Sequence, residues 1–215
     1  EMCIRDSCPL VHRELDRLTS SAHPSGRNLS CHDQGGYQRD VSKQFHTVLP
    51  WLLADEFVAN EIMPEIDHYF HEGTFPRHLV KQFGDLGLLG LNLPEEYGCA
   101  GMSHTAYGLV CQELERGDSG LRSFASVQGS LSMHPIHKFG TEEQKQKYLP
   151  RMATGELIGC FGLTEPDYGS NPGGLITKAE DKGDHYLLNG AKMWITNGTI
   201  CLLYTSPSPR DGLLS

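Results

Sequence analysis

Apolar residues recur every three to four positions where the patterned part of the chain begins. Between residues 54 and 69, Phe57, Ile62 and Ile66 fall on one face of a helix, and Pro64 interrupts that face. Proline has no amide proton to donate and its ring clashes with the preceding turn, so it kinks a helix or ends it. This pattern predicts an amphipathic helix that bends near Pro64.

Two further helices are predicted from their end signals. Pro76 suits a first helical position, and Gly87 suits the residue that follows a last turn. Ser103 can accept a hydrogen bond from the amides that begin the next helix, which Gly117 then ends. Apolar stripes between the two signals of each pair support both assignments.

A fourth helix is predicted over residues 119–133, with small residues on one face. Ser123, Ser126 and Ser130 fall three and four residues apart and therefore lie close together on the helix surface. Small side chains leave room for a ligand, or they let a neighbouring helix pack closely. The pattern alone leaves both interpretations open.

The character of the chain changes after a fifth helix. Thr141 and Gln144 have the spacing of a capping box, and Gly155 is a suitable end. Short β-favouring segments follow, separated by Gly, Pro, Asn and Asp. They span residues 157–163, 175–179, 185–188 and 192–196. Asn189-Gly190 is a typical hairpin turn, so we predict that the last two segments pair across it.

Helices followed by strands indicate an α+β fold with segregated layers. We predict an all-α helical domain at 51–156 and the first part of a middle antiparallel β-domain at 157–200. Residues 1–50 lack sustained periodicity and are expected to be a disordered or non-native leader. Residues 201–215 are expected to be a non-native tail, because both ends contain runs that look like translated sequencing adapter.

Charge and hydropathy exclude several classes of partner. The formal net charge is −9, and no dense run of Lys and Arg could attract a phosphate backbone, so we predict no nucleic acid partner. No stretch approaches the roughly 20 apolar residues that cross a bilayer, and no signal-peptide pattern is present, so no membrane insertion is predicted.

Cysteine usage indicates reduced thiols and no metal. The chain has 7 cysteines, an odd number, and no CxxC pair. Cys3, Cys8 and His12, together with Cys31-His32, could in principle ligate zinc, but their spacings match no standard zinc site. No metal-binding residue is therefore predicted.

A loop rich in Gly, Ser, Asn and Pro follows Leu163-Thr164-Glu165-Pro166. Such a loop exposes backbone amides and hydroxyls on one rim, which suits an anionic or carbonyl-rich ligand. The same composition also fits a simple turn. Trp194, taken alone, is more typical of a core than of a cofactor platform.

Short motifs between Glu113 and Asn197 carry a family resemblance. They are Glu113-Leu-Glu-Arg-Gly-Asp-Ser-Gly-Leu-Arg-Ser123, Ser126-Val-Gln, His134-Pro-Ile, Phe139-Gly-Thr-Glu-Glu-Gln, Lys147-Tyr-Leu-Pro, Phe161-Gly-Leu-Thr-Glu-Pro, Gly169-Ser170 and Trp194-Ile-Thr-Asn197. Together they resemble the acyl-CoA dehydrogenase family, and the glutaryl-CoA dehydrogenase branch of it most. The resemblance does not extend into residues 1–50.

The resemblance implies an FAD-dependent enzyme whose C-terminal helical bundle is missing from this chain. Leu163 and Thr164 would hydrogen-bond the flavin ring, and Ser170 would reach both the FAD pyrophosphate and the thioester ligand. Trp194 would pack on the flavin ring, and Thr196 would approach its N5 edge. The implied cofactor-binding residues are Phe161, Gly162, Leu163, Thr164, Gly169, Ser170, Trp194, Ile195 and Thr196.

The same resemblance implies a substrate. In a glutaryl-type enzyme Arg122 and Ser123 would lie at the closed end of the acyl pocket and hold a distal carboxylate, with Glu115 in the same polar group and Ser170 at the thioester. The planar fork of arginine suits a carboxylate because it can bond both oxygens. The alternative is an ordinary ion pair between Arg122 and Glu115 near the helix ends.

The implied reaction removes an α-proton and transfers a β-hydrogen to FAD, and with glutaryl-CoA it continues by decarboxylation to crotonyl-CoA. No catalytic residue is predicted here, because the family's base belongs to the C-terminal domain, and Glu165 is expected to be structural. The implied electron acceptor is electron-transferring flavoprotein. The full-length parent is expected to be a homotetramer in bacterial cytoplasm, with the mitochondrial matrix as the alternative.

Three other functional hypotheses compete with glutaryl-CoA oxidation. The parent protein could be a short- or branched-chain acyl-CoA dehydrogenase, or an oxidase that uses oxygen. These enzymes would share the loop motifs and differ in the acyl pocket or in the electron acceptor. The third hypothesis is that the 215-residue chain itself is an inactive truncated fragment.

Overall fold

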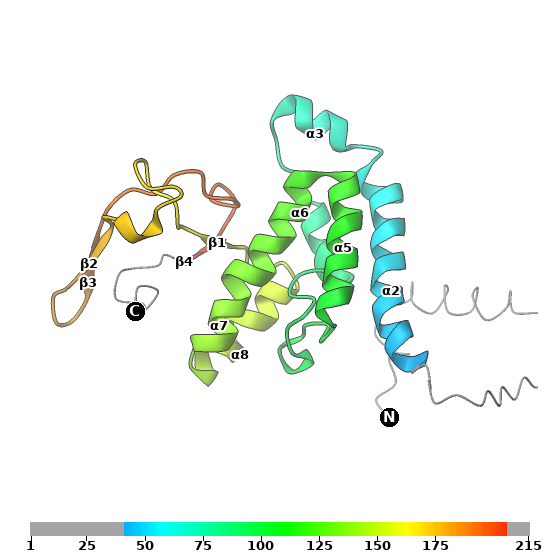
Figure 1. Ribbon diagram of the computed structural model, residues 1–215, viewed down its shortest axis with the longest axis horizontal. Coiled ribbons are helices and arrows are strands. Elements are labelled where there is room, and N and C mark those ends of the chain that lie inside the picture. Colours follow the sequence, from blue (N-terminus) through cyan, green and yellow to red (C-terminus); the bar gives the residue numbers. More distant parts are fainter. Residues whose placement is uncertain (1–40, 206–215) are drawn as a thin grey trace, which may run out of the picture. The chain divides into compact units, whose positions relative to one another are not determined.

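The computed structural model describes residues 41–205, and Figure 1 shows helices first and short strands after them. Cys3, Cys8, His12 and Cys31-His32 lie outside the described residues. The α-helices are α2 (Val41–Phe57), α3 (Ile66–Glu72), α4 (Leu79–Asp85), α5 (His104–Gly117), α6 (Ser119–Ser126), α7 (His134–Phe139) and α8 (Glu142–Ala153). Two π-helical segments, η2 (Val58–Ile62) and η4 (Val127–Met133), and two 3₁₀ turns, η3 (Glu95–Tyr97) and η5 (Pro172–Gly174), lie between them. The strands are β1 (Gly159–Phe161), β2 (Lys178–Asp181), β3 (Tyr186–Asn189) and β4 (Leu203–Thr205).

Both π-helical segments end shortly before a proline. Segment η2 precedes Pro64, and segment η4 precedes Pro135 in the first turn of α7. Proline cannot donate to the carbonyl four residues earlier and its ring crowds that carbonyl, so the preceding turn widens. The predicted bend near Pro64 is confirmed, and α2 begins well before it, at Val41.

The predicted helix caps are also confirmed. The Ala106 amide donates to Ser103 Oγ over 3.2 Å at the start of α5. Thr141 and Gln144 make both bonds of the capping box, because each side chain accepts from the other residue's amide, over 3.3 and 2.9 Å. One start differs from the prediction, since α4 begins at Leu79 and residues 76–78 form a turn before it.

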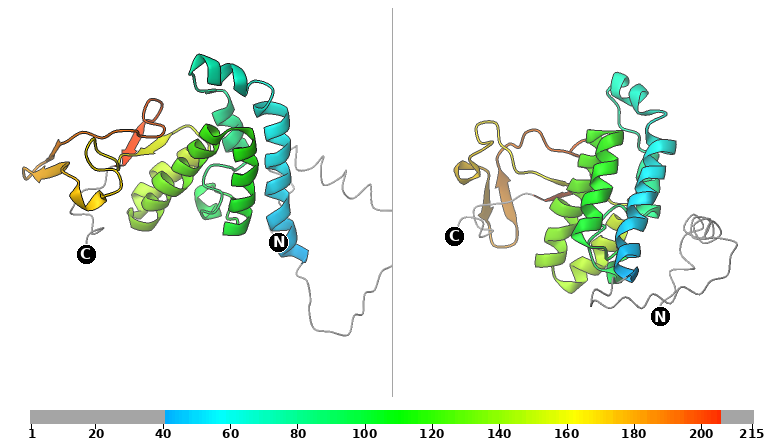
Figure 2. Two further views of the ribbon diagram at one scale, coloured as in Figure 1. Left: turned by 45° about the horizontal axis from the view of Figure 1, so that its top comes forward. Right: turned by 45° about the vertical axis from the view of Figure 1, so that its right-hand side comes forward.

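The core of the helical part is built on aromatic contacts between elements. The ring of Phe83 in α4 packs edge-on against Phe57 and Phe124, at centroid distances of 5.0 and 5.5 Å. Figures 1 and 2 show α5 between α2 and α6, and Trp51 Nε1 of α2 donates to Glu113 of α5 over 2.8 Å. These contacts fix the position of α6, which carries Arg122.

A single buried amide joins the helices to the first strand. Gln128 in segment η4 is 0% exposed, and its Nε2 donates to the carbonyls of Met152 and Leu157 over 2.9 and 2.7 Å. Its Oε1 accepts from the Gly159 amide over 2.8 Å. Both donors and the acceptor of this side chain are thus satisfied without water, and β1 is held directly against η4.

The strands form two small sheets, and together with the helices they confirm the α+β prediction. Strands β2 and β3 pair antiparallel from Lys178 opposite Asn189 to Asp181 opposite Tyr186. Strands β1 and β4 pair in parallel, with Gly159 opposite Leu203. Strand β4 lies within residues 201–215, so the segment expected to be a non-native tail supplies one strand of this sheet.

Two β predictions were wrong. The hairpin turn falls at Lys182–His185, not at Asn189-Gly190, because the Lys182 amide donates to the His185 carbonyl over 2.9 Å. Gly183 supplies the positive φ, +97°, that this turn needs. The predicted strand at 192–196 is irregular, because Trp194 takes a φ of +59°, which no strand accommodates.

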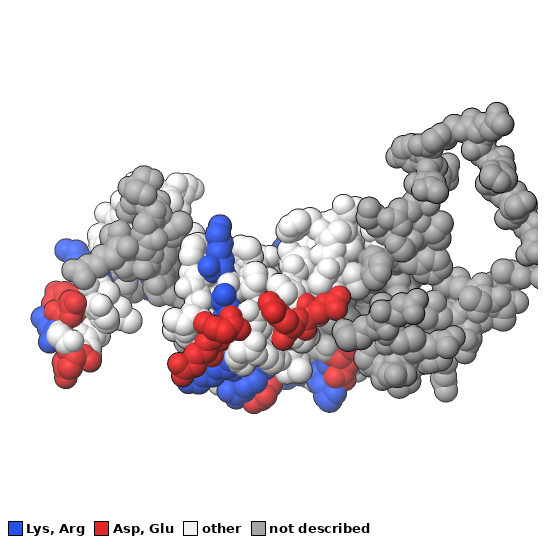
Figure 3. Space-filling model, turned by 90° about the horizontal axis from the view of Figure 1, so that it is seen from below, with Lys and Arg blue, Asp and Glu red and all other residues white. Residues whose placement is uncertain are grey.

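Surface charge is mixed over the described residues. On the face in Figure 3, Lys and Arg side chains lie among Asp and Glu side chains and form no single basic field. Lys81 with Asp85, and Arg151 with Glu156, are two of the ion pairs of the helical part. None of the described helices has the length and hydropathy that a membrane span needs.

Candidate functional site

The first half of the candidate site follows β1, where the chain leaves the helical part. Phe161, Leu163 and Thr164 are half-buried, and Gly162 is buried. The chain then turns at residues 165–168, where the amides and carbonyls of Glu165 and Tyr168 exchange two bonds of 3.1 Å. This turn presents Gly169 and Ser170 to solvent, and a side chain at Gly169 would meet nothing within 4 Å.

Glu165 begins this turn, and its side chain is buried, since the residue is 2% exposed. Its Oε2 accepts from the Ile176 amide over 2.8 Å, and its Oε1 accepts from the Thr177 amide and from Lys192 Nζ, each over 3.0 Å. Every strong contact of the carboxylate is therefore made within the protein, which supports the structural role predicted for Glu165.

The surroundings of Glu165 favour its charged form. Burial acts to raise the pKa of this carboxyl, but the contacts with Thr177, with the Ile176 amide and with the Lys192 ammonium outweigh it and lower the pKa to about 2. A carboxylate that stays charged at neutral pH and faces the protein interior cannot act as a base toward a substrate outside it.

The second half of the site, Trp194 to Thr196, is tied to the first half by Lys192 and Met193. Lys192 Nζ donates to the Leu163 carbonyl over 3.0 Å, and the Met193 amide donates to the Thr164 carbonyl over 2.8 Å. Both halves of the predicted cofactor-binding set are thereby brought together. No signal in the sequence indicated this role of Lys192, because a lysine in a short polar segment is ordinarily solvated.

The segment 194–197 leaves its aromatic side chain in solvent. Trp194 is 84% exposed, Ile195 is half-buried and Thr196 is exposed. Asn197 anchors the end of the segment, because its Nδ2 donates to the Gly159 carbonyl over 3.2 Å and, more weakly, to the Phe124 carbonyl over 3.5 Å. Both Trp194 and Asn197 have positive φ, a conformation that asparagine tolerates better than most residues.

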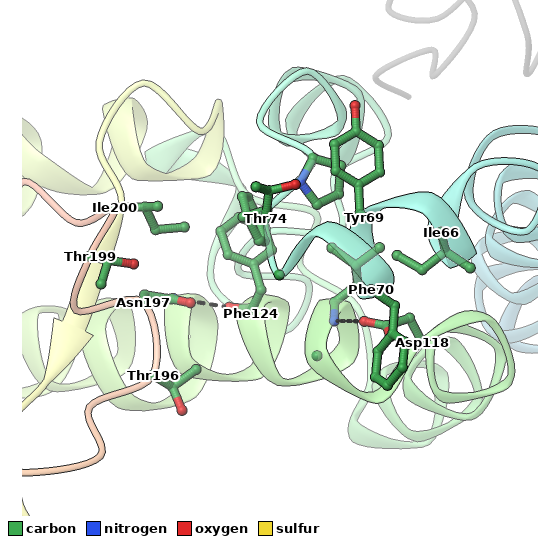
Figure 4. A pocket seen from close by; sticks show the side chains of 15 residues that line it. Ile66, Tyr69, Phe70, Thr74, Asp118, Phe124, Thr196, Asn197, Thr199 and Ile200 are labelled. Carbon is green, nitrogen blue, oxygen red and sulfur yellow. Dashed lines mark hydrogen bonds between the residues drawn. The ribbon is translucent and has the colours of Figure 1, made fainter.

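A groove of about 470 Å³ lies beside this anchor. Figure 4 shows Phe124 and Asn197 on one side of it and Tyr69 and Phe70 on another. Thr196 borders the groove as well. Its lining is mostly apolar and includes none of the polar residues predicted to bind substrate, so the groove is distinct from the predicted carboxylate site.

The predicted substrate residues Glu115 and Arg122 meet at the junction of α5 and α6. Arg122 Nε donates to Glu115 Oε2 over 2.5 Å, and Ser119 Oγ donates to Glu115 Oε1 over 2.6 Å. The hydrogen bond to Glu115 raises the pKa of Arg122, and the bonds from Ser119 and Arg122 lower the pKa of Glu115. The pair is partly exposed, with 33% of the arginine side chain and 47% of the glutamate side chain accessible.

A hydroxyl cluster lies one helical turn beyond Arg122 and was not predicted as a binding site. Tyr107 Oη is 3.2 Å from Ser126 Oγ and 3.1 Å from Ser130 Oγ. Ser126 is four residues after Arg122 and shares its helix face, whereas Ser123 lies about 100° around the helix from Arg122. The small-residue pattern at 123, 126 and 130 contained this signal, because Ser126 and Ser130 are now seen to face one tyrosine.

Two family models match the chain. The model "Acyl-CoA dehydrogenase, N-terminal domain" covers residues 53–156, and the model "Acyl-CoA dehydrogenase, middle domain" covers residues 160–207. The first range contains the helices and the second contains the 161–170 and 194–196 segments. The chain belongs to the acyl-CoA dehydrogenase family.

Individual relatives support the same family and differ in substrate. The chain is 44% identical to a probable acyl-CoA dehydrogenase of Bacillus subtilis over 74% of this chain and 43% of that protein. It is 42% identical to the human mitochondrial short-chain specific acyl-CoA dehydrogenase over 75% of this chain and 39% of that protein. The crystal structure of a glutaryl-CoA dehydrogenase from Mycobacterium smegmatis in complex with FADH2 is similar at 50% identity, with a TM-score of 0.73 over 78% of this chain and 42% of that one. The chain thus spans less than half the length of each of these relatives.

Proposed function

We propose that the protein to which this chain belongs is an FAD-dependent acyl-CoA dehydrogenase that oxidises and decarboxylates glutaryl-CoA and passes its electrons to electron-transferring flavoprotein. The family membership and the similarity to a glutaryl-CoA dehydrogenase support this proposal. When bound, FAD supplies a ring that accepts the substrate's β-hydrogen as hydride.

The residues of the β part fit one side of a flavin. A flavin ring needs a flat apolar partner, and Trp194 offers an indole that is 84% exposed on a segment anchored by Asn197. A pyrophosphate needs hydrogen-bond donors on an open rim, and the Gly169-Ser170 turn is exposed with space beside Gly169. We propose that Leu163, Thr164 and Trp194 to Thr196 form this side, with Phe161 and Gly162 supporting it.

The observation that carries the choice of glutaryl-CoA is the free edge of Arg122. Glu115 bonds the Nε atom, and among the residues whose side chains are described no acceptor bonds either terminal nitrogen of the guanidinium. Those nitrogens can take the two oxygens of a distal substrate carboxylate. Ser126, on the same helix face, offers a hydroxyl within one turn, and Glu115 holds the arginine plane in place. Ser123 remains a further predicted contact, and Ser170 is proposed to contact the thioester.

Substrate preference of the full-length enzyme tests this choice. Arg122→Ala removes charged hydrogen bonds worth about 1.5–3 kcal/mol, so the ratio of kcat/KM for glutaryl-CoA to that for butyryl-CoA should fall roughly 10- to 100-fold. Arg151→Ala is the matched control, since Arg151 also pairs with a glutamate on the helical part and should leave the ratio unchanged.

A short-chain acyl-CoA dehydrogenase is the second candidate, and the 42% identity to the human short-chain enzyme favours it. A short straight-chain substrate would leave the Arg122 edge without a carboxylate. The wild-type enzyme would then prefer butyryl-CoA, and Arg122→Ala would not shift the preference. This outcome would reject glutaryl-CoA and keep the family assignment.

We further propose that the 215-residue chain alone is inactive and that the full-length enzyme is a homotetramer. The chain spans 42% of the length of the glutaryl-CoA dehydrogenase, and Glu165, the buried acidic residue of the proposed flavin segment, bonds groups within the protein. The purified chain should therefore not reduce a dye acceptor with glutaryl-CoA, and turnover by it would contradict the proposal. Light scattering of the full-length enzyme would test the tetramer, which a dimer mass would refute.

A further inference from the structure

Three separated segments of the β part meet at one buried ion pair. Glu165 follows the Leu163-Thr164 segment, and its carboxylate accepts from the amides of Ile176 and Thr177, over 2.8 and 3.0 Å. Lys192 reaches the same carboxylate over 3.0 Å from the segment that leads to Trp194. The glutamate side chain is 1% exposed and the lysine side chain 16% exposed.

The geometry of the pair sets the direction of the peptide groups around it. Lys192 Nζ holds the Leu163 carbonyl over 3.0 Å. A trans peptide is planar, so its carbonyl and the amide of the next residue point in opposite directions. The Lys192 contact therefore turns the Thr164 amide away from the ion pair. In the same way the Met193 amide, bonded to the Thr164 carbonyl over 2.8 Å, fixes the second peptide of this segment.

The pair also acts on the other half of the site through the chain itself. Lys192 precedes Trp194 by two residues, and the segment in which Trp194 takes its positive φ is held at both ends, by Lys192 and by Asn197. Two kinds of polar contact are therefore described between the Leu163-Thr164 segment and the Trp194 segment. One is the bond from the Met193 amide to the Thr164 carbonyl, and the other is made by Lys192, which bonds both the Leu163 carbonyl and Glu165.

We propose that Glu165 and Lys192 are positioning residues that lock the Leu163-Thr164 segment to the Trp194 segment, so that both meet the same face of one FAD ring. This proposal rests on the proposed flavin site. Neither residue touches the cofactor or the substrate; each acts through the peptide groups and the indole that it holds.

The first arm of the test needs no flavin and uses the 215-residue chain. Glu165→Gln and Lys192→Met each leave one buried charge without its partner, and the double variant removes both charges. Hydrogen exchange by mass spectrometry should be about tenfold faster in peptides that cover 162–168 and 190–197 for the double variant, and unchanged in peptides from α5 and α8. Exchange at the wild-type rate in both site peptides would overturn the lock.

The control is an exposed ion pair elsewhere in the β part, at the turn between β2 and β3. Lys182 Nζ lies 2.9 Å from Glu180 Oε2, and both side chains are about half exposed, at 45% and 51%. The double variant Glu180→Gln with Lys182→Met also removes one negative and one positive charge, but it leaves the contacts of the Leu163 and Thr164 carbonyls intact. Hydrogen exchange in both site peptides of this control should match wild type. If it were as fast as in the Glu165 and Lys192 double variant, the effect would be a general destabilisation of the β part, and the proposal would be overturned.

The second arm separates positioning from stability in the full-length enzyme. Each single variant should melt at a lower temperature than wild type, because it leaves one buried charge unpaired. The double variant Glu165→Gln with Lys192→Met should melt close to wild type, because no unpaired charge remains, yet its FAD affinity measured by equilibrium dialysis should be at least about tenfold weaker than that of wild type. A purely structural pair would recover both together, which would overturn the proposal. A wild-type enzyme that binds no FAD, with faster exchange in the variant, would instead reject the proposed flavin site.

Discussion

The helical part and the β part of the chain are stabilised by different interactions. In the helical part Phe83 and Phe124 are 0% and 1% exposed, whereas in the β part Tyr186, Leu188 and Trp194 are 63%, 67% and 84% exposed. The helices bury a shared apolar core. Residues 180–191 are exposed throughout, and the β part is held by a few polar contacts instead.

This difference identifies where function is expected. A two-stranded hairpin without a covered face is only marginally stable, and exposed aromatic and aliphatic side chains mark surfaces that bind something. The residues proposed to contact the flavin lie in the β part, next to one of its buried polar contacts, the Glu165–Lys192 pair. The helical part contributes Arg122, which we propose to bind the substrate carboxylate, on a helix that packs against the apolar core.

The contrast between the two parts predicts that a substitution in the helical core lowers the free energy of unfolding far more than a substitution in the β part. Phe83→Ala removes a ring that packs on Phe57 and Phe124, so unfolding free energy should fall by about 3–5 kcal/mol. Leu188→Ala, at an exposed position, should change it by less than about 0.5 kcal/mol. Urea denaturation followed by helical circular dichroism measures both, and equal losses would show that the hairpin is part of the core.

The junction between the two parts should be nearly as sensitive. Gln128→Met keeps the volume of the side chain but leaves the Gly159 amide and the Met152 and Leu157 carbonyls without their partner. Unsatisfied buried groups cost about 1–3 kcal/mol each, so we expect a loss of roughly 2–4 kcal/mol after local relaxation. Thermal unfolding would measure it, and a melting temperature like that of wild type would mean that β1 is not held by this amide.

A smaller and pH-dependent effect should distinguish the β part. The pKa of Glu165, about 2, lies below its ordinary value of 4.5, so the charged form is bound more tightly in the folded state. Its stabilisation is complete above about pH 4.5 and is lost as the pH falls toward about 2. In Glu165→Gln the stability should decline less between about pH 5 and pH 3 than in wild type. Equal decline in the two proteins, by urea denaturation at each pH, would show that Glu165 is not strongly paired.

Local sequence signals predicted the helices well, because caps and prolines act on neighbouring residues. Ser103, Thr141 and Pro64 each act within about one turn, and each appears where its chemistry requires. The hairpin was misplaced because two turn signals competed. Asn189-Gly190 is a typical hairpin dipeptide, yet Gly183 forms the turn, and its amide donates to Asp181 Oδ1 over 2.8 Å.

Sequence motifs predicted which residues form the candidate site but not how they are arranged in space. Family motifs located Leu163, Thr164 and Trp194, but no local pattern indicates that Lys192 and Glu165 meet across 27 residues of chain. The left-handed conformation of Trp194 was likewise unpredictable, since it follows from distant anchors and not from its neighbours. Long-range polar contacts are therefore what the structure adds.

The central claim is that Leu163, Thr164 and Trp194 form one side of a flavin site. FAD binding to the full-length enzyme, measured by equilibrium dialysis for wild type and Trp194→Ala, tests it most directly. The exposed indole should contribute stacking worth about 1 kcal/mol or more, so the variant should bind FAD at least about fivefold more weakly while its melting temperature without FAD stays the same. Equal FAD affinity in the two proteins would contradict the claim.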